Sequence, residues 1–276
     1  MTVSRDNLKN VESHFAFGKN WAEYASLIGD PQIEQATKGL LKLIPENEFK
    51  GHSFLDIGCG SGLHALGAAR LGVSRIVAID IDPDSVAVTR ALLSGKDIQG
   101  PWRADIMSVF DLDAARQGTF DIVYSWGVLH HTGAIWEAID KAASMVAPNG
   151  LLAIAIYRKT LMDPFWKFEK RLYSRAPKIV QHCIQAGYVA AFRLGKLARG
   201  DNFRDYVANY KSTRGMDFYT DVHDWLGGYP YETAVAPEVD LRLVNLGFKS
   251  ERVFSRPTSV GIFGSGCDEY VYRLMR

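Results

Sequence analysis

Apolar and polar positions follow two alternating periods along most of this chain. Short apolar runs, typical of buried strands, alternate with segments whose apolar residues recur at helical spacing. These runs predict strands at 52–57, 75–80, 101–105, 120–125, 151–157, 249–255 and 268–275. The segments between them predict helices at 62–71, 83–93, 133–146 and 237–246. Strands that alternate with helices favour parallel pairing with right-handed crossovers, and therefore an α/β fold.

Two stretches fall outside this alternation. Residues 10–43 have apolar residues at helical spacing, interrupted at Pro31, and predict two N-terminal helices. Residues 160–226 contain amphipathic segments and no clear strand. We interpret this second stretch as an insertion into one large domain, because the strand and helix alternation resumes after it.

Composition narrows the class of protein. The 276 residues are 47% hydrophobic, which is enough to bury a full core, and the net charge of +1 argues against a general attraction to nucleic acid. Three widely spaced cysteines match neither a disulfide framework nor a zinc site, so we expect no metal and a reducing compartment. The N-terminus lacks the apolar core of a signal peptide, and we expect a cytoplasmic protein.

A glycine-rich turn follows the first predicted strand. Gly58, Gly60 and Gly62 occupy alternate positions just before a helix. Glycine lets backbone amides approach a ligand closely and permits a positive φ. Asp80, at the end of the second strand, can accept hydrogen bonds from a ribose diol. These features predict a nucleoside-containing cofactor. The turn with Ala65 also matches the dinucleotide pattern, so an NAD-dependent oxidoreductase remains an alternative.

Two further acids favour one cofactor over the other. Asp56 precedes the first glycine by two residues, where it would repel a pyrophosphate and attract a ligand that carries an ammonium and a sulfonium. Asp105 closes the third strand, where a carboxylate can accept from an adenine amine. The fourth strand then runs into an aromatic and histidine-rich segment, Phe120–His131.

The motifs LDIGCGSG, AIDIDPDS, AD and FDIVYSWGVLHH occur in this order. With them the chain resembles the class I S-adenosylmethionine-dependent methyltransferases over roughly residues 50–157. The resemblance implies a Rossmann-like seven-stranded sheet, mostly parallel with an antiparallel last strand, and S-adenosyl-L-methionine as cofactor. It also implies four domain segments: an N-terminal helical cap (1–48), a cofactor-binding half (49–159), a helical lid or acceptor insertion (160–232) and a C-terminal helix and strands that complete the sheet (233–276).

The resemblance also assigns roles to residues of these motifs. The three glycines line the methionine portion, Asp56 orders the turn, and Asp80 binds the ribose. The remaining contacts are Ile81, Asp105 and Ile106 around the adenine, and Ser125 and Trp126 beneath the sulfonium. By analogy with the N-terminal helices of this family, Phe17 and Trp21 cover the methionine end, where Trp21 could attract the sulfonium by a cation–π interaction. Ordinary helix packing is the alternative for both.

The insertion is unusually basic. Residues 158–199 hold ten basic and two acidic side chains, a local charge of +8 (10 − 2). A basic amphipathic segment of this kind can lie on an anionic membrane surface or bind an acidic acceptor. The alternative, which we favour, is a lid whose apolar face packs on the domain while its lysines are solvated.

Residues 214–232 are dense in aromatics and acids and contain one histidine. His223 is the leading candidate for a general base, with Tyr219 to orient it and His131 as the second candidate. Packing or capping by His223 is the alternative. We expect O-methylation of a small molecule such as a sugar, carboxylate or phenol. N-methylation, a tRNA target and a binding protein without turnover remain open, as does the oligomeric state.

Overall fold

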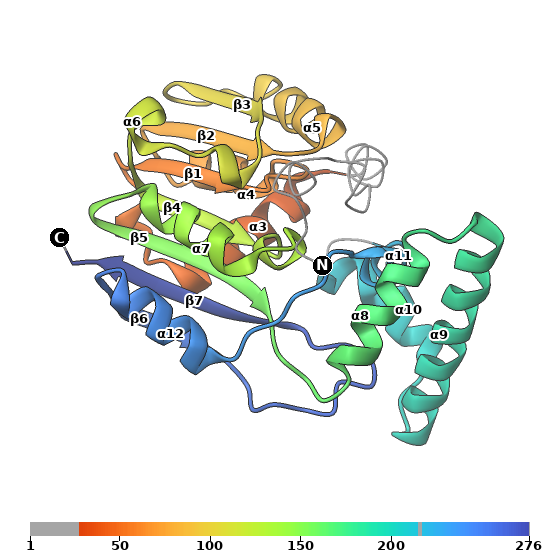
Figure 1. Cartoon of the computed structure of the whole chain (residues 1–276). Helices are drawn as coiled ribbons and strands as arrows, with labels where there is room; N and C mark the ends of the chain where they lie inside the picture. Colours follow the sequence, from red (N-terminus) through yellow and green to blue (C-terminus); the bar gives the residue numbers. More distant parts are fainter. Residues whose placement is uncertain (1–27, 215–216, 276) are drawn as a thin grey trace.

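The computed structural model describes residues 28–214 and 217–275 (Figure 1). Within these residues, seven strands form one sheet in the order β3-β2-β1-β4-β5-β7-β6. The strands are β1 (Ser53–Ile57), β2 (Arg75–Asp80), β3 (Trp102–Ile106), β4 (Phe120–Trp126), β5 (Val146–Tyr157), β6 (Phe248–Phe254) and β7 (Cys267–Leu274). Strands β1 to β5 pair in parallel, whereas β7 is antiparallel to both of its neighbours. The predicted Rossmann-like sheet with an antiparallel last strand is confirmed.

Helices cover both faces of this sheet. Helices α3 (Asp30–Leu43), α4 (Leu63–Arg70) and α5 (Pro83–Ser94) pack on one face, and α7 (Ile135–Ser144) and α12 (Ala236–Asn245) pack on the other. Because successive strand residues point to opposite faces, Phe54 joins the cluster under α3 and Leu55 joins the cluster under α7. The shorter helical elements are η2 (Glu46–Glu48), η3 (Val109–Asp111), α6 (Ala114–Gln117) and η4 (Leu129–His131).

Helix α3 is part of the core of the sheet domain. Ile33, Leu40 and Leu43 are buried in the same cluster as the β1 and β2 side chains. The second predicted N-terminal helix therefore exists and packs directly against α4 and the sheet. The first predicted helix, with Phe17 and Trp21, lies outside the described residues, so the predicted cap at 1–48 stays a prediction.

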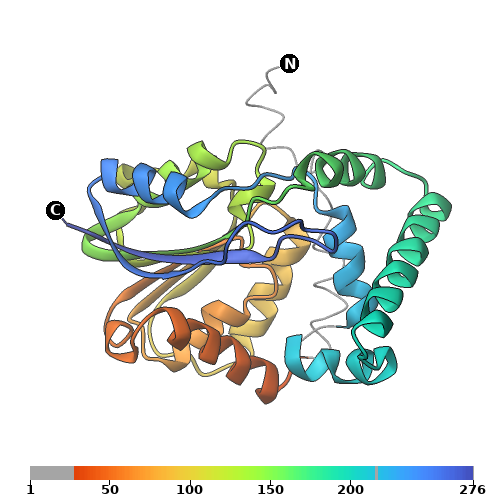
Figure 2. The same ribbon diagram turned by 90° about the horizontal axis from the view of Figure 1, so that it is seen from below.

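Four helices follow β5 in place of strands. They are α8 (Asp163–Tyr173), α9 (Lys178–Ala198), α10 (Phe203–Arg214) and α11 (Phe218–Gly227). These helices share a separate apolar cluster that includes Trp166, Tyr173, Phe218 and Leu226. Helix α9 forms the outer edge of the molecule in both views (Figures 1 and 2). The segment is therefore a helical layer beside the sheet, and its role as a lid or acceptor insertion stays a prediction.

One basic residue of this layer is not solvated. Lys170 is completely buried, and its ammonium lies 3.6 Å from the centre of the Trp225 ring and donates to the Trp225 carbonyl oxygen. The expectation that the lysines of the insertion are solvated is wrong at this position, because the cation–π contact holds the ammonium inside the aromatic cluster.

The two ends of the helical layer are joined to each other. The chain leaves the sheet after Tyr157 and returns at Ala234, where Ala234 N donates to Tyr157 O and Lys159 N donates to Ala234 O, both at 3.1 Å. Arg158 and Ala234 form a parallel bridge between these bonds. No helix in the described parts of the chain combines the length and apolar character needed to cross a membrane.

Candidate functional site

A cavity of about 1650 Å³ lies at the carboxyl edge of the parallel strands and continues to the helical layer. Its lining has two chemically distinct ends. The glycine turn, the residues that follow β2 and β3, and the segment after β4 form one end. Aromatic residues of α9, α10 and α11 form the other end. Loops at the carboxyl ends of parallel strands are the usual ligand site of such sheets.

The glycine turn adopts a backbone that only glycine tolerates easily. Gly58, Gly60 and Gly62 have φ values of +75°, +52° and +79°. A Cβ atom on Gly58 would lie 2.4 Å from Val128 Cγ2, and one on Gly62 would lie 3.0 Å from the Thr89 side chain. The turn therefore packs its backbone directly against Val128 and Thr89, and Gly58 and Gly60 line the cavity.

Two buried carboxylates support this turn. Asp80 Oδ2 accepts from Gly60 N at 3.0 Å and its Oδ1 accepts from Asp82 N at 2.9 Å. Burial raises the pKa of Asp80 to about 6, although these backbone hydrogen bonds favour the ionised form. Asp80 itself lines the cavity, at the position expected for a ribose ligand.

Asp56 lies beneath the turn rather than in the cavity wall. It is 2% exposed, and its Oδ2 has no hydrogen-bond partner among the described residues. Burial, together with the nearby charge of Asp80, raises the pKa of Asp56 to about 7, while a hydrogen bond from the Ala65 backbone lowers it. With this pKa, Asp56 is only partly ionised near neutral pH in the cofactor-free chain, and a cationic ligand bound at the turn would favour its carboxylate form.

The other predicted cofactor residues divide into two groups. Ile81 and Trp126 line the cavity. Asp105, Ile106 and Ser125 are not among the lining residues. Asp105 instead pairs with Arg103 at 3.1 Å, and Ile106 is 56% exposed. Ser125 is buried, and its Oγ donates to Ile57 O at 3.0 Å, which joins β4 to β1.

Residues directly after β3 line the cavity in place of Asp105. They are Met107, Ser108, Val109 and Phe110. Their position just beyond the end of a strand is a signal that sequence reasoning could have used, because the segments that follow parallel strands meet at the same edge of the sheet.

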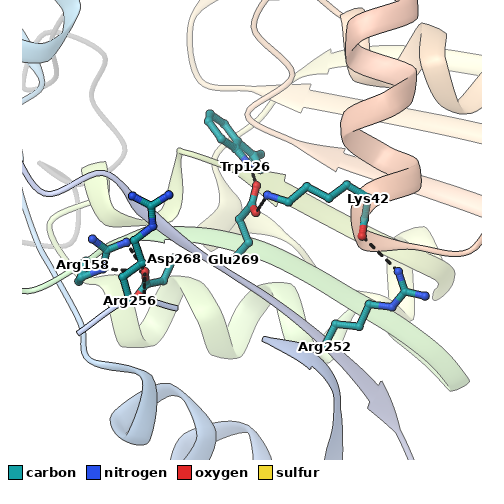
Figure 3. A network of polar contacts seen from close by, with 7 residues as sticks. All are labelled: Lys42, Trp126, Arg158, Arg252, Arg256, Asp268 and Glu269. Atoms are coloured by element: carbon teal, nitrogen blue, oxygen red, sulfur yellow. Dashed lines mark hydrogen bonds and ion pairs between the residues drawn. The ribbon is translucent and has the colours of Figure 1, made fainter. Parts of the chain in front are cut away.

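A polar network on β7 positions Trp126 (Figure 3). The indole Nε1 of Trp126 donates to Glu269 Oε1 at 3.0 Å, and Lys42 of α3 pairs with the other oxygen of the same carboxylate. On the neighbouring residue, buried Asp268 accepts from Arg158 Nε at 2.7 Å. Sequence reasoning missed this network, since no local motif connects β7 to residues that lie 110 or more positions earlier.

The two adjacent histidines have different environments. His130 is fully buried, and its Nδ1 accepts from Tyr157 N at 3.3 Å. Burial lowers the pKa of His130 well below the usual range, so this ring is neutral. His131 lines the cavity, and its Nδ1 contacts Pro230 O at 2.8 Å. Because a carbonyl can only accept, Nδ1 carries the proton and the neutral His131 ring keeps its lone pair on Nε2.

The structure does not bring His223 and Tyr219 into the cavity wall. His223 Nδ1 is 2.6 Å from the Tyr173 hydroxyl, and burial lowers the pKa of its imidazole. Tyr219 is 48% exposed. Helix α11 instead presents Asp221 and Asp224 to the cavity. The roles predicted for His223 and Tyr219 stay predictions, and the observed contacts favour packing for His223.

The far end of the cavity is aromatic and contains acids. Its rings come from Tyr157, Tyr188, Phe192, Tyr206, Trp225 and Phe263. Asp221 accepts a hydrogen bond from Tyr210, and Asp224 is the second acid. Arg158 lines this region but is paired with Asp268. Aromatic walls of this kind bind flat apolar groups, whereas the charged part of the lining is mixed, because Arg256 also lines the cavity.

A family model described as "Methyltransferase domain" matches residues 30–206. The Ubiquinone biosynthesis O-methyltransferase of Xanthomonas euvesicatoria pv. vesicatoria is 35% identical over 113 residues, which is 41% of this chain and 46% of the relative. The protein of the same name from Chelativorans sp. is 39% identical over 116 residues, or 41% of this chain and 43% of the relative. The matched region thus spans less than half the length of these relatives.

Solved structures show the same fold at low sequence identity. The N-methyltransferase NodS from Bradyrhizobium japonicum, in complex with S-adenosyl-L-homocysteine, has a TM-score of 0.52 at 13% identity and covers 95% of this chain and 100% of its own. PKMT2 from Rickettsia typhi, in complex with AdoHcy, has a TM-score of 0.54 at 14% identity, with coverage of 90% and 53%. At these identities the likeness concerns the fold alone.

Proposed function

Because this chain belongs to the methyltransferase-domain family, we propose that it is an S-adenosylmethionine-dependent enzyme that methylates a hydroxyl of a small, largely aromatic acceptor. One observation carries this proposal. A single cavity joins the glycine turn and Asp80 at one end to a wall of aromatic rings at the other. Transfer of a group between two ligands requires both to lie in one continuous space.

The residues at the sheet edge fit the cofactor. Asp80 lines the cavity, where its carboxylate can accept ribose hydroxyls, and Gly58 and Gly60 line it where the methionine portion would bind. Asp56 lies behind the turn with an unpartnered oxygen, and a bound cation would favour its ionised form, which supports a cationic ligand over a pyrophosphate. When bound, S-adenosylmethionine supplies an electrophilic methyl group on a sulfonium. Ile81, Val109 and Trp126 contribute apolar surface to the part of the cavity in which we propose that the cofactor binds.

The aromatic end supports a ring-containing acceptor over a sugar or a free carboxylate. Its rings give stacking surface, and the two acids Asp221 and Asp224 outnumber Arg256, the exposed arginine of the lining. The Ubiquinone biosynthesis O-methyltransferases that share sequence with this chain agree with this acceptor class.

His131 is the residue best placed to handle the acceptor proton. Its Nδ1 is committed to Pro230 O, so Nε2 of the neutral ring can take a hydroxyl proton. It lines the cavity from η4, the short helix after β4, and its ring centre lies 5.2 Å from that of Tyr157 at the aromatic end. The surrounding apolar and aromatic side chains exclude water and align the acceptor.

A second candidate function is N-methylation of an aromatic amine. The carboxylates of Asp221 and Asp224 can accept hydrogen bonds from the amine N–H groups, and the surrounding rings can stack on its ring. An aromatic amine is neutral near pH 7 and attacks through its own lone pair, so the reaction would depend less on His131. Paired phenol and aniline acceptors of the same shape distinguish the two activities.

Calorimetry tests the cofactor part of this proposal. S-adenosylhomocysteine should bind and NAD should not. Asp80→Asn should weaken binding about 10- to 100-fold, since a hydrogen bond to a charged group contributes about 1.5–3 kcal/mol. Asp84→Asn is the matched control, because Asp84 is exposed and does not line the cavity. Equal affinities of the two variants, or tight binding of NAD, would refute the assignment.

A further inference from the structure

Helix α9 has two different sides. Tyr188 and Phe192 face the cavity, yet no residue of α9 is buried. Ile179, Leu194 and Leu197 are 78%, 66% and 69% exposed. No charged residue occurs from Ile179 to Phe192. The helix that forms one wall of the cavity therefore presents an uncharged apolar surface at the edge of the molecule (Figure 2).

Helix α8, which precedes α9 in the chain, also exposes apolar side chains. Phe165, Phe168 and Leu172 recur at spacings of three and four residues, so they share one face of the helix, and they are 50%, 68% and 50% exposed. The opposite face of α8, with Trp166 and Tyr173, is buried in the helical layer. We define the outer face by six residues: Phe165, Phe168, Leu172, Ile179, Leu194 and Leu197. Exposed apolar surface of this extent marks an interaction site.

The exposed charged side chains within residues 165–199 have one sign. Its exposed cations are Lys167, Arg171, Arg175, Lys178, Arg193 and Arg199. None of them forms an ion pair with another side chain in the described residues. The two acids of this segment are not available to balance them. Asp163 accepts hydrogen bonds from Thr160 and Thr233, and Glu169 is 8% exposed.

We propose that the outer face docks on the surface of an anionic lipid bilayer. Apolar side chains of such a helix enter the boundary between headgroups and acyl chains, while the flanking cations meet lipid phosphates. A second copy of this chain is the less suitable partner, because a symmetric contact would oppose identical positive faces. The inference rests on the exposure and charge of α8 and α9 and is independent of the proposed methyl transfer.

This docking would also place the cavity next to the membrane. Since Tyr188 and Phe192 lie on the same helix as Ile179 and Leu194, the aromatic end of the cavity and the outer face are separated by the width of α9. An apolar acceptor dissolved in the bilayer would then reach the enzyme without crossing water.

Vesicle co-sedimentation of the full chain tests this inference. The protein should bind phosphatidylcholine vesicles that contain phosphatidylglycerol at least about tenfold more tightly than phosphatidylcholine alone, and high salt should weaken the binding. Ile179→Asp combined with Leu194→Asp should abolish it. Leu241→Asp on α12, where the leucine is 64% exposed, is the matched control. Lys178→Glu should weaken binding, whereas Lys249→Glu on β6, also exposed, should not.

Insertion of α9 has its own readout. Cys183 is exposed within the uncharged stretch, so a polarity-sensitive fluorophore on its thiol should shift to the blue with anionic vesicles. Cys183→Ser treated with the same reagent gives the background. Equal vesicle binding by the Ile179/Leu194 variant and the Leu241 control would overturn the inference. A second result would also overturn it. In that result the wild type does not bind vesicles but forms a dimer in sedimentation velocity, and the Ile179/Leu194 variant is a monomer. Circular dichroism and S-adenosylhomocysteine affinity establish that the variants fold.

Discussion

Trp126 Nε1 donates a hydrogen bond to Glu269 Oε1 at 3.0 Å, which connects the end of β4 to the last strand of the sheet. Trp126 lies in the cavity wall, so the carboxylate on β7 decides how the indole faces the ligand. Lys42 of α3 holds the same carboxylate from the other side. Three elements that are distant in sequence thus orient one ring in the site.

Removal of this carboxylate should disturb the indole and the activity together. We expect Glu269→Ala to lower kcat/KM about tenfold, because one hydrogen bond near a charged group is worth about 1.5 kcal/mol. Glu269→Gln should retain most activity, since an amide oxygen still accepts from the indole. A shift in tryptophan emission that appears in Glu269→Ala and not in Glu269→Gln would identify a positioning role. Equal kinetics of the two variants would contradict it.

The glycine turn should reject a single methyl group at Gly58. In Gly58→Ala the new Cβ would meet Val128, and we expect a loss of about 2 kcal/mol of unfolding free energy together with weaker cofactor binding. Gly51→Ala is the control, because Gly51 has a φ of +80° but no atom within 4 Å of its Cβ position. Urea unfolding with and without S-adenosylhomocysteine measures both effects. Val128→Ala added to Gly58→Ala should recover part of the loss, and a failure to recover would exclude the steric explanation.

The raised pKa of Asp56 should make the cofactor-free fold less stable at high pH. Asp56 titrates at about 7 in the folded chain and near 3.9 when unfolded, so the folded state binds the extra proton between these values. Its contribution to stability is therefore complete below about pH 4 and is lost as the pH rises through 7.

Asp56→Asn removes this titration. The wild type loses unfolding free energy as the pH rises from 5 to 8, whereas the variant lacks this loss. The difference in unfolding free energy between the two proteins should therefore change by about 3 kcal/mol in favour of the variant over this range. Urea unfolding of the cofactor-free proteins at four pH values gives the measurement, with Asp84→Asn as an exposed aspartate control. Parallel pH curves for wild type and Asp56→Asn would show that burial does not perturb this acid.

The two histidine candidates for the base can be separated by substitution. His131→Asn keeps a donor for Pro230 O but lacks the Nε2 lone pair, and it should lower kcat about a hundredfold or more for a phenolic acceptor. The activity lost should partly return at high pH, where the acceptor ionises without help. His223→Ala should retain kcat, because His223 contacts Tyr173 outside the cavity wall. The reverse result would restore His223 as the base.

The alternation of periods was sufficient to predict the sheet, because each strand carries its own apolar run. The start of β5 was harder to predict from the sequence. The apolar run predicts a strand over 151–157, yet the strand begins at Val146, which pairs with Phe120 before an irregularity in the register. Ala147, Pro148 and Asn149 fall within this irregularity, and the early start of the strand depends on the pairing of Val146 with Phe120, which no local pattern encodes.

The sequence predicted the features of the site that depend on local backbone conformation. It did not predict those that depend on contacts between side chains distant in the fold. The positive φ of Gly58 and the end of β2 at Asp80 both follow from local sequence. Asp105 occupies an equivalent strand end, but Arg103 on the same strand attracts its carboxylate. Burial of Lys170 among aromatic rings likewise depends on α11, more than fifty residues later in the chain. Partner choice of this kind requires the assembled fold.

The hydrogen bonds that join Tyr157 and Lys159 to Ala234 hold together the two chain segments that lead into and out of the four helices α8 to α11. All the residues of α9, α10 and α11 that line the far end of the cavity lie between these two joined segments. A graft made at these residues would exchange one helical layer for another and leave every strand pair intact. An exchange of the segment between these residues would therefore change which acceptors fit the cavity, while the glycine turn that we propose binds the cofactor would stay the same.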